Sequence, residues 1–229
     1  MNQSNNRSVG FPVLLVVIGL VVGFAITLLS AMAYYKPKVD AAKTASVPTT
    51  STKAADLRSS LVTLGVEHMT LTDQAVDAAL DGNANATATG AALYANGNTI
   101  GTAVGSIYGK DAETTFDSVW KLHLDQFVKY AVADKTGNAA GKQAALDSIQ
   151  QNYTVPLATY LAKANPNLPQ STLQSMLSEH VSMTATMIDD HVKGDYTAEA
   201  AQLDMANTHI AGLFSALAGG IVKQYPNKF

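Results

Sequence analysis

The sequence predicts an all-α protein, in which an N-terminal transmembrane helix precedes a bundle of three repeated antiparallel helical hairpins, six helices in all. Two observations support this fold class. An uncharged apolar run near the N-terminus has the length that crosses a bilayer, which takes about 20 apolar residues. After residue 53, apolar residues recur at helical spacing, and the same spacing from a histidine to a glycine occurs three times.

The N-terminal segment is expected to form a tail at residues 1–10 and a transmembrane anchor at residues 11–35, because no charge occurs between Arg7 and Lys36. A signal peptide cleaved near Ala33 is the alternative, since small residues flank that position. The apolar run is longer than the roughly 7–15 residues of a signal peptide, which favours an uncleaved anchor.

Residues 36–52 are rich in Ala, Ser, Thr and Pro and are expected to be a linker. The lysines of this stretch would place the rest of the chain in the cytoplasm by the positive-inside rule. A linker of this composition is more typical of a stalk outside the membrane. We therefore expect a single-pass cell-membrane protein with its bulk extracytoplasmic, or a secreted form if the anchor is cleaved.

Residues 53–229 are expected to form the helical bundle, with hairpin repeats at about 53–108, 111–165 and 169–224. In each hairpin the first helix carries an apolar stripe that contains one histidine. A glycine follows fourteen residues later, in a short polar turn where it would end the helix. The three histidine–glycine pairs are His68–Gly82, His123–Gly137 and His180–Gly194.

Composition excludes several classes of site. The chain has no cysteine, so disulfides, thiolate metal sites and thiol nucleophiles are excluded. Its net charge of −3 and the lack of a basic cluster argue against nucleic-acid binding. No di-iron, zinc-peptidase or phosphate-loop motif occurs, and we expect a protein that is not an enzyme.

The conspicuous histidines are expected to pair with polar residues at the same depth of each hairpin. Such pairs would fix the register of two helices, because buried polar groups need hydrogen-bond partners. This structural interpretation needs no cofactor and is the favoured one. The expected pairs are His68 with Asn98, His123 with Asn152, and His180 with His209.

A metal site in the third hairpin is the alternative interpretation. His180, His209, Met183 and Met205 would lie near one seam. Imidazole and thioether groups suit copper, and they also serve as axial ligands of haem. Two facing imidazoles would also repel each other when protonated, which gives a minor pH-sensing alternative.

Three segments carry a resemblance to known proteins: residues 64–68 (LGVEH), residues 120–130 (WKLHLDQFVKY) and residues 224–229 (QYPNKF). Over residues 55–229 the chain resembles a group of uncharacterised exported helical-repeat proteins of bacteria. The resemblance implies an exported, envelope-associated protein and implies no activity.

The expected function is a non-enzymatic binding or interaction module of the cell envelope, attached to the membrane through residues 11–35. Its protein partner is not indicated by the residues. The alternative is a copper- or haem-binding protein that uses the third hairpin.

Overall fold

The computed structural model describes residues 52–229, and all regular structure in that range is helical, without a β-strand. The expected all-α class with six helices is thus confirmed for this part of the chain. The N-terminal tail, the transmembrane anchor at residues 11–35 and the linker up to residue 51 lie outside the described residues.

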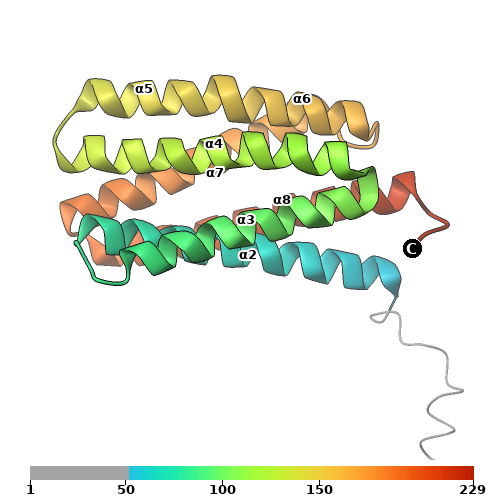
Figure 1. Ribbon diagram of the computed structural model, residues 1–229, viewed down its shortest axis with the longest axis horizontal. Coiled ribbons are helices and arrows are strands. Elements are labelled where there is room, and N and C mark those ends of the chain that lie inside the picture. Colours follow the sequence, from blue (N-terminus) through green and yellow to red (C-terminus); the bar gives the residue numbers. More distant parts are fainter. Residues whose placement is uncertain (1–51) are drawn as a thin grey trace, which may run out of the picture. The chain divides into compact units, whose positions relative to one another are not determined.

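The helices alternate in direction along the chain (Figure 1). Three segments, α5, η2 and α6, follow one another without a break and form one rod, in which η2 is a π-helical turn. The bounds are α2 Lys53–Leu80, α3 Ala86–Tyr108, α4 Lys110–Lys135, α5 Ala139–Ile149, η2 Gln150–Thr154, α6 Val155–Ala164, α7 Gln170–Lys193 and α8 Tyr196–Gln224.

Local sequence signals set where these helices begin and end. The side chains of Thr52, Asn138 and Asp195 cap the first turns of α2, α5 and α8 by accepting a hydrogen bond from a backbone N–H three residues later. Three glycines take a left-handed backbone conformation just after α2, α4 and α7, which favours glycine there. They are Gly82 (φ 69°), Gly137 (φ 66°) and Gly194 (φ 74°).

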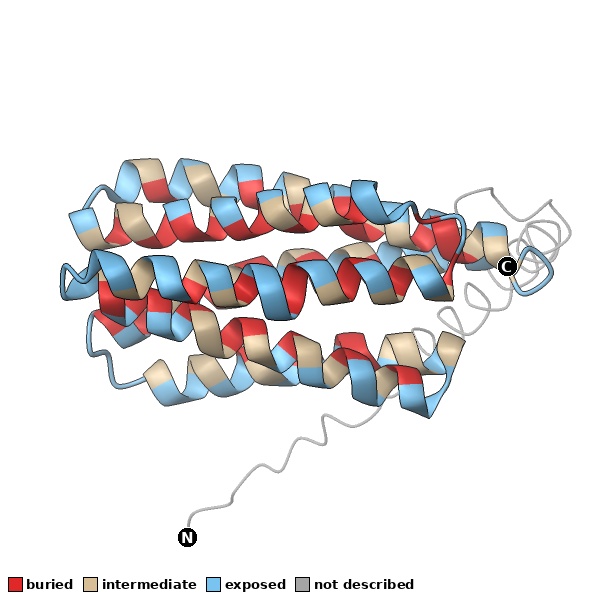
Figure 2. Ribbon diagram, turned by 90° about the horizontal axis from the view of Figure 1, so that it is seen from above, coloured by how far each residue is buried: buried red, intermediate tan, exposed pale blue. Residues whose placement is uncertain are grey.

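The first helix of each pair lies inside the bundle. Helices α2, α4 and α7 contact one another and run in the same direction (Figure 1). The second helices lie outside them: α3 packs on α2 and α4, α8 packs on α2 and α7, and the α5–α6 rod packs on α4 and α7. The apolar stripes of α2, α4 and α7 therefore face one central axis. Figure 2 shows buried and exposed residues alternating along the helices of the bundle.

Among the described helices, α8 is long and apolar enough to span a membrane by length and composition. It lies at the C-terminal end of the chain, whereas the sequence prediction placed the spanning helix at the N-terminus. The side chains of Ile210, Leu213 and Phe214 on α8 are buried in the bundle. A buried core helix meets the same criterion, so this property of α8 has a packing explanation.

Candidate metal centre

Three histidines meet where α2, α4 and α7 face one another. His68, His123 and His180 are 1%, 0% and 2% exposed. One ring nitrogen from each lies within 4.8 Å of the others. The ring centroid of His68 is 5.7 Å from that of His123 and 6.0 Å from that of His180. We call these three residues the histidine triad.

Aromatic rings hold the triad in place. The Trp120 ring lies 4.8 Å from the His68 ring and 4.7 Å from the His123 ring, measured between centroids. The Tyr153 ring stacks on His123 at 4.2 Å. Trp120 fits there because the facing residue on α3 is Gly97, where an added Cβ would lie 2.8 Å from the indole.

Most of the imidazole nitrogens in the triad have no hydrogen-bond partner. They are Nδ1 of His68 and both ring nitrogens of His123 and His180. Leaving a buried polar group unsatisfied costs about 1–3 kcal/mol, and native proteins rarely do so. These five nitrogens converge at one point in the core, where the three imidazoles could hold a metal ion.

The three imidazoles are neutral at physiological pH. Burial, with a contribution from His180, lowers the pKa of His68 to about 3. Burial, with a contribution from His209, lowers the pKa of His180 to about 4. The pKa of His123 lies well below its ordinary value because of burial and the neighbouring His68 and His180. Neutral imidazole is the form that binds metal ions.

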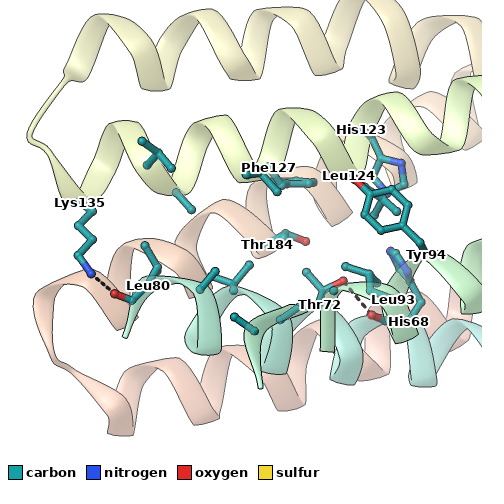
Figure 3. Close-up of a pocket in the computed structure, with 18 of the residues that line it drawn as sticks. His68, Thr72, Leu80, Leu93, Tyr94, His123, Leu124, Phe127, Lys135 and Thr184 are labelled. Atoms are coloured by element: carbon teal, nitrogen blue, oxygen red, sulfur yellow. Dashed lines mark hydrogen bonds between the residues drawn. The ribbon is translucent and has the colours of Figure 1, made fainter. Parts of the chain in front are cut away.

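A cavity of about 290 Å³ adjoins all three histidines. It runs from the triad along the inner face of α2, between α3 and α4, toward the end of the bundle that carries Leu80 and Lys135 (Figure 3). There the Lys135 ammonium donates a hydrogen bond to the carbonyl of Leu80. The wall of the cavity is mainly apolar and includes Ala75, Val76, Leu93, Leu124, Phe127 and Ala131.

The expected pairing of His68 with Asn98 and of His123 with Asn152 is wrong, because both asparagines are exposed. Residues at the same depth of a hairpin need not share a face, since each helical residue turns by about 100°. In α3 the buried amide belongs to Asn96, which donates to the Leu64 carbonyl and to the Glu67 carboxylate.

The π-helical turn explains the second of these errors. It adds a residue to the turn between α5 and α6 and changes which side chains face the core. Tyr153 and Thr154 are buried, whereas Asn152 is at the surface and donates to the Ser148 hydroxyl. The core partner of His123 is therefore Tyr153.

The four residues of the expected metal site are placed differently from one another. His180 belongs to the triad, while His209 makes a hydrogen bond of 2.8 Å to the Met176 carbonyl. Met205 is 50% exposed, and Met183 is partly buried against the apolar core. His180 thus meets the corresponding histidines of the other two helix pairs. The equal spacing of the three histidines was the sequence signal for this grouping.

A second cluster, which the sequence did not reveal, joins α2, α7 and α8. Nδ1 of His191 lies 3.0 Å from a carboxylate oxygen of Asp77 and 3.0 Å from one of Glu199, and Nε2 lies 3.2 Å from Asp81. Burial and the nearby Glu199 raise the pKa of Asp77 to about 7. His191 has a hydrogen-bond partner at each ring nitrogen, Glu199 and Asp81, unlike most nitrogens of the triad, so we interpret the cluster as an ion-pair network between helices.

Comparison of the chain with models of known protein families, with curated protein sequences and with solved structures finds no match.

Proposed function

We propose that the helical bundle is a non-enzymatic binding module whose ligand is one transition metal ion, zinc or copper, held by His68, His123 and His180. The observation that carries the proposal is the set of five unpartnered nitrogens on three neutral, fully buried imidazoles. Imidazole nitrogen is a preferred ligand of both metals. Coordination would satisfy atoms that otherwise destabilise the core.

The spacing of the rings suits a single ion. Zinc binds imidazole nitrogen at about 2.0–2.1 Å, so three ligands of one tetrahedral ion have nitrogens about 3.4 Å apart. The triad nitrogens lie within 4.8 Å of one another, and small side-chain rotations close the difference. A haem fits less well, because the rings of Trp120 and Tyr153 pack directly against the imidazoles and occupy the space that a macrocycle needs.

A binding role is favoured over catalysis. Three histidines with one open position also occur in catalytic zinc sites, which use nearby groups to move protons. Here the cavity wall contains no carboxylate among the described residues. The hydroxyls of Thr72 and Thr184 donate to the carbonyls of His68 and His180, so their protons are already engaged.

The proposal includes the setting of the module. An anchor at residues 11–35 would hold it in the cell membrane, and the linker composition supports an extracytoplasmic position. The bundle would then present a metal site at the cell envelope. Fractionation of cells that express the tagged full chain, with and without protease added outside, tests this placement.

Metal titration of the full chain tests the proposed function. Trp120 is the only tryptophan of the chain and lies against two of the triad rings, so Cu²⁺ in the triad should quench its fluorescence. We expect saturation at one Cu²⁺ per metal-depleted chain, and Zn²⁺ should compete and restore the emission.

Two substitutions locate the site. His123→Leu should abolish stoichiometric binding, and His209→Gln is the matched control because His209 is a largely buried histidine outside the triad. Loss of binding in the control alone would move the site to the third helix pair. Failure of the unaltered chain to bind either metal in a one-to-one ratio would refute the proposal.

A further inference from the structure

We infer that the cavity beside the triad holds the alkyl chain of a fatty acid of about ten to twelve carbons, with its carboxylate on the triad-bound metal ion. The position of the carboxylate rests on the proposed metal site. The fit of the chain rests on the cavity alone. The shape, the wall, the charge of the centre and the opening of the cavity each support the assignment.

The cavity has the volume and length of one extended chain. An apolar cavity of roughly 150 Å³ holds one benzene, a molecule of six carbons. The present cavity has about 290 Å³, which corresponds to roughly twice as many carbons by the same measure. On α2 its wall extends from His68 to Leu80, which is about 18 Å at a rise of about 1.5 Å per residue. A long, narrow space fits a chain better than a compact ring system.

The wall of the cavity offers an alkyl chain apolar contacts along its length. Between the triad and the far end, small and branched apolar side chains from α2, α3 and α4 form most of the surface. Among the residues that the structure describes, the wall has one charged side chain, Lys135, at the end away from the triad (Figure 3). A charged or strongly polar ligand body would lose its hydration here without compensation.

The metal centre requires an anion. A divalent ion bound by three neutral imidazoles keeps its full charge, and burying an uncompensated charge is very costly. The cavity wall supplies no carboxylate among the described residues. A carboxylate on the ligand would neutralise part of the charge and fill the fourth position that three histidines leave open, since carboxylate oxygen is a normal ligand of zinc.

The cavity reaches the surface between α3 and α4. Val128 and Val132 line it and are 57% and 58% exposed, so they mark its rim on α4. On the α3 side the wall includes Gly90, and no atom lies within 4 Å of the position that a Cβ would take there. An opening flanked by exposed valines and a bare glycine is suited to the entry of an apolar chain.

Brominated fatty acids test both the binding and its orientation, because bromine quenches tryptophan only at short range. The full chain in phospholipid nanodiscs, loaded with Zn²⁺, would be titrated with 2-bromodecanoic acid and with 10-bromodecanoic acid. If the carboxylate lies on the metal, the 2-bromo acid should quench Trp120 strongly and the 10-bromo acid weakly. The metal-free chain should bind the 2-bromo acid at least tenfold more weakly.

Matched glycine substitutions control for partition into the lipid. Gly90→Leu would fill the opening and should weaken quenching at least tenfold. Gly212→Leu is the control, because Gly212 is an exposed helical glycine whose Cβ would also meet open space, away from the cavity. Both substitutions add a better helix former, so a difference between them reports on the cavity.

The outcomes separate this inference from the proposed function. Stoichiometric zinc binding without quenching by either acid would overturn the fatty-acid inference and leave the metal site standing. Stronger quenching by the 10-bromo acid would overturn the orientation, since the chain would then point its tail at the triad. Quenching that is equal with and without zinc would overturn the coordination of the carboxylate.

Discussion

The imidazole of His123 lies nearly parallel to the phenol ring of Tyr153, with centroids 4.2 Å apart and an angle of 20° between the planes. Tyr153 belongs to the π-helical turn, and it is 1% exposed. Such turns are rare and occur often at functional sites. Here the turn directs a large ring at one of the three candidate metal ligands and fixes that ligand from the side.

The stacked pair predicts how substitution of Tyr153 affects the fold. Tyr153→Ala removes a buried aromatic ring and should lower the free energy of unfolding by about 3–5 kcal/mol. Tyr153→Phe keeps the ring and should lower it by less than about 1.5 kcal/mol. Urea denaturation of both variants measures the difference. Equal losses would show that the hydroxyl, and not the stacking on His123, is what matters.

The unpartnered nitrogens predict an unusual effect of His123→Leu. In the metal-free chain this change removes two unsatisfied buried atoms, so it should raise the free energy of unfolding by about 1 kcal/mol. The melting temperature should then rise by about 2–4 °C. With zinc present at about 1,000 times its dissociation constant, the unaltered chain gains about 4 kcal/mol and the order reverses. Thermal denaturation without zinc should show the variant to be more stable than the unaltered chain, and with zinc less stable. A variant that is less stable in both conditions would contradict the conclusion that the His123 nitrogens are unsatisfied in the metal-free chain.

Acid should destabilise the metal-free protein through the triad. The pKa of His68 is about 3 and that of His180 about 4 in the folded chain, below the ordinary value of 6.5. At pH values between the folded-state pKa of each histidine and 6.5, the unfolded chain binds protons that the folded chain does not. Each histidine therefore contributes stability that is complete above pH 6.5 and is lost as the pH falls, by up to about 1.4 kcal/mol per pH unit. Urea denaturation at pH 7 and pH 5 measures the loss, which should be smaller in His123→Leu.

Asp77 should make the stability of the fold depend on pH in the direction opposite to that of the triad histidines. Its pKa in the folded chain is raised from 3.8 to about 7 by burial and by the nearby Glu199. The folded state thus binds a proton that the unfolded state releases, and this contribution is lost as the pH rises through 7. Asp77→Asn should therefore gain stability relative to the unaltered chain at pH 8 and lose that advantage at pH 5. Asp204→Asn, at an exposed position of α8, is the control for the loss of one carboxylate.

The helices could be predicted because their signals are local. Apolar residues at helical spacing and the glycine turns depend on neighbours in the sequence alone. These signals indicated where the helices of residues 53–224 begin and end.

The grouping of the histidines could not be predicted in the same way. Depth along a hairpin relates residues within one helix pair, whereas the triad depends on how three pairs pack around a common axis. The π-helical turn changes the inward face by one residue and replaced the expected Asn152 with Tyr153. The cluster around His191 likewise joins residues from α2, α7 and α8 that no sequence spacing connects.

A substitution at Gly97 should disturb the triad although no histidine is changed. A methyl group at this position would lie 2.8 Å from the Trp120 indole, and the indole is already in contact with Phe116, His68 and His123. The ring would have to shift, and the imidazoles of His68 and His123 pack directly against it, so the shift would disturb them.

The expected result of Gly97→Ala is therefore a loss in both stability and metal binding. Overpacking costs about 1–3 kcal/mol, and the better helix propensity of alanine returns about 1 kcal/mol. Metal affinity should fall about tenfold, because displacing the imidazoles should cost about 1.4 kcal/mol of binding free energy, which corresponds to that factor. Gly212→Ala is the control, because a Cβ there meets open space and brings only the gain in helix propensity. If both variants bind Cu²⁺ as tightly as the unaltered chain, Trp120 does not position the triad, and the histidines hold their geometry through α2, α4 and α7 alone.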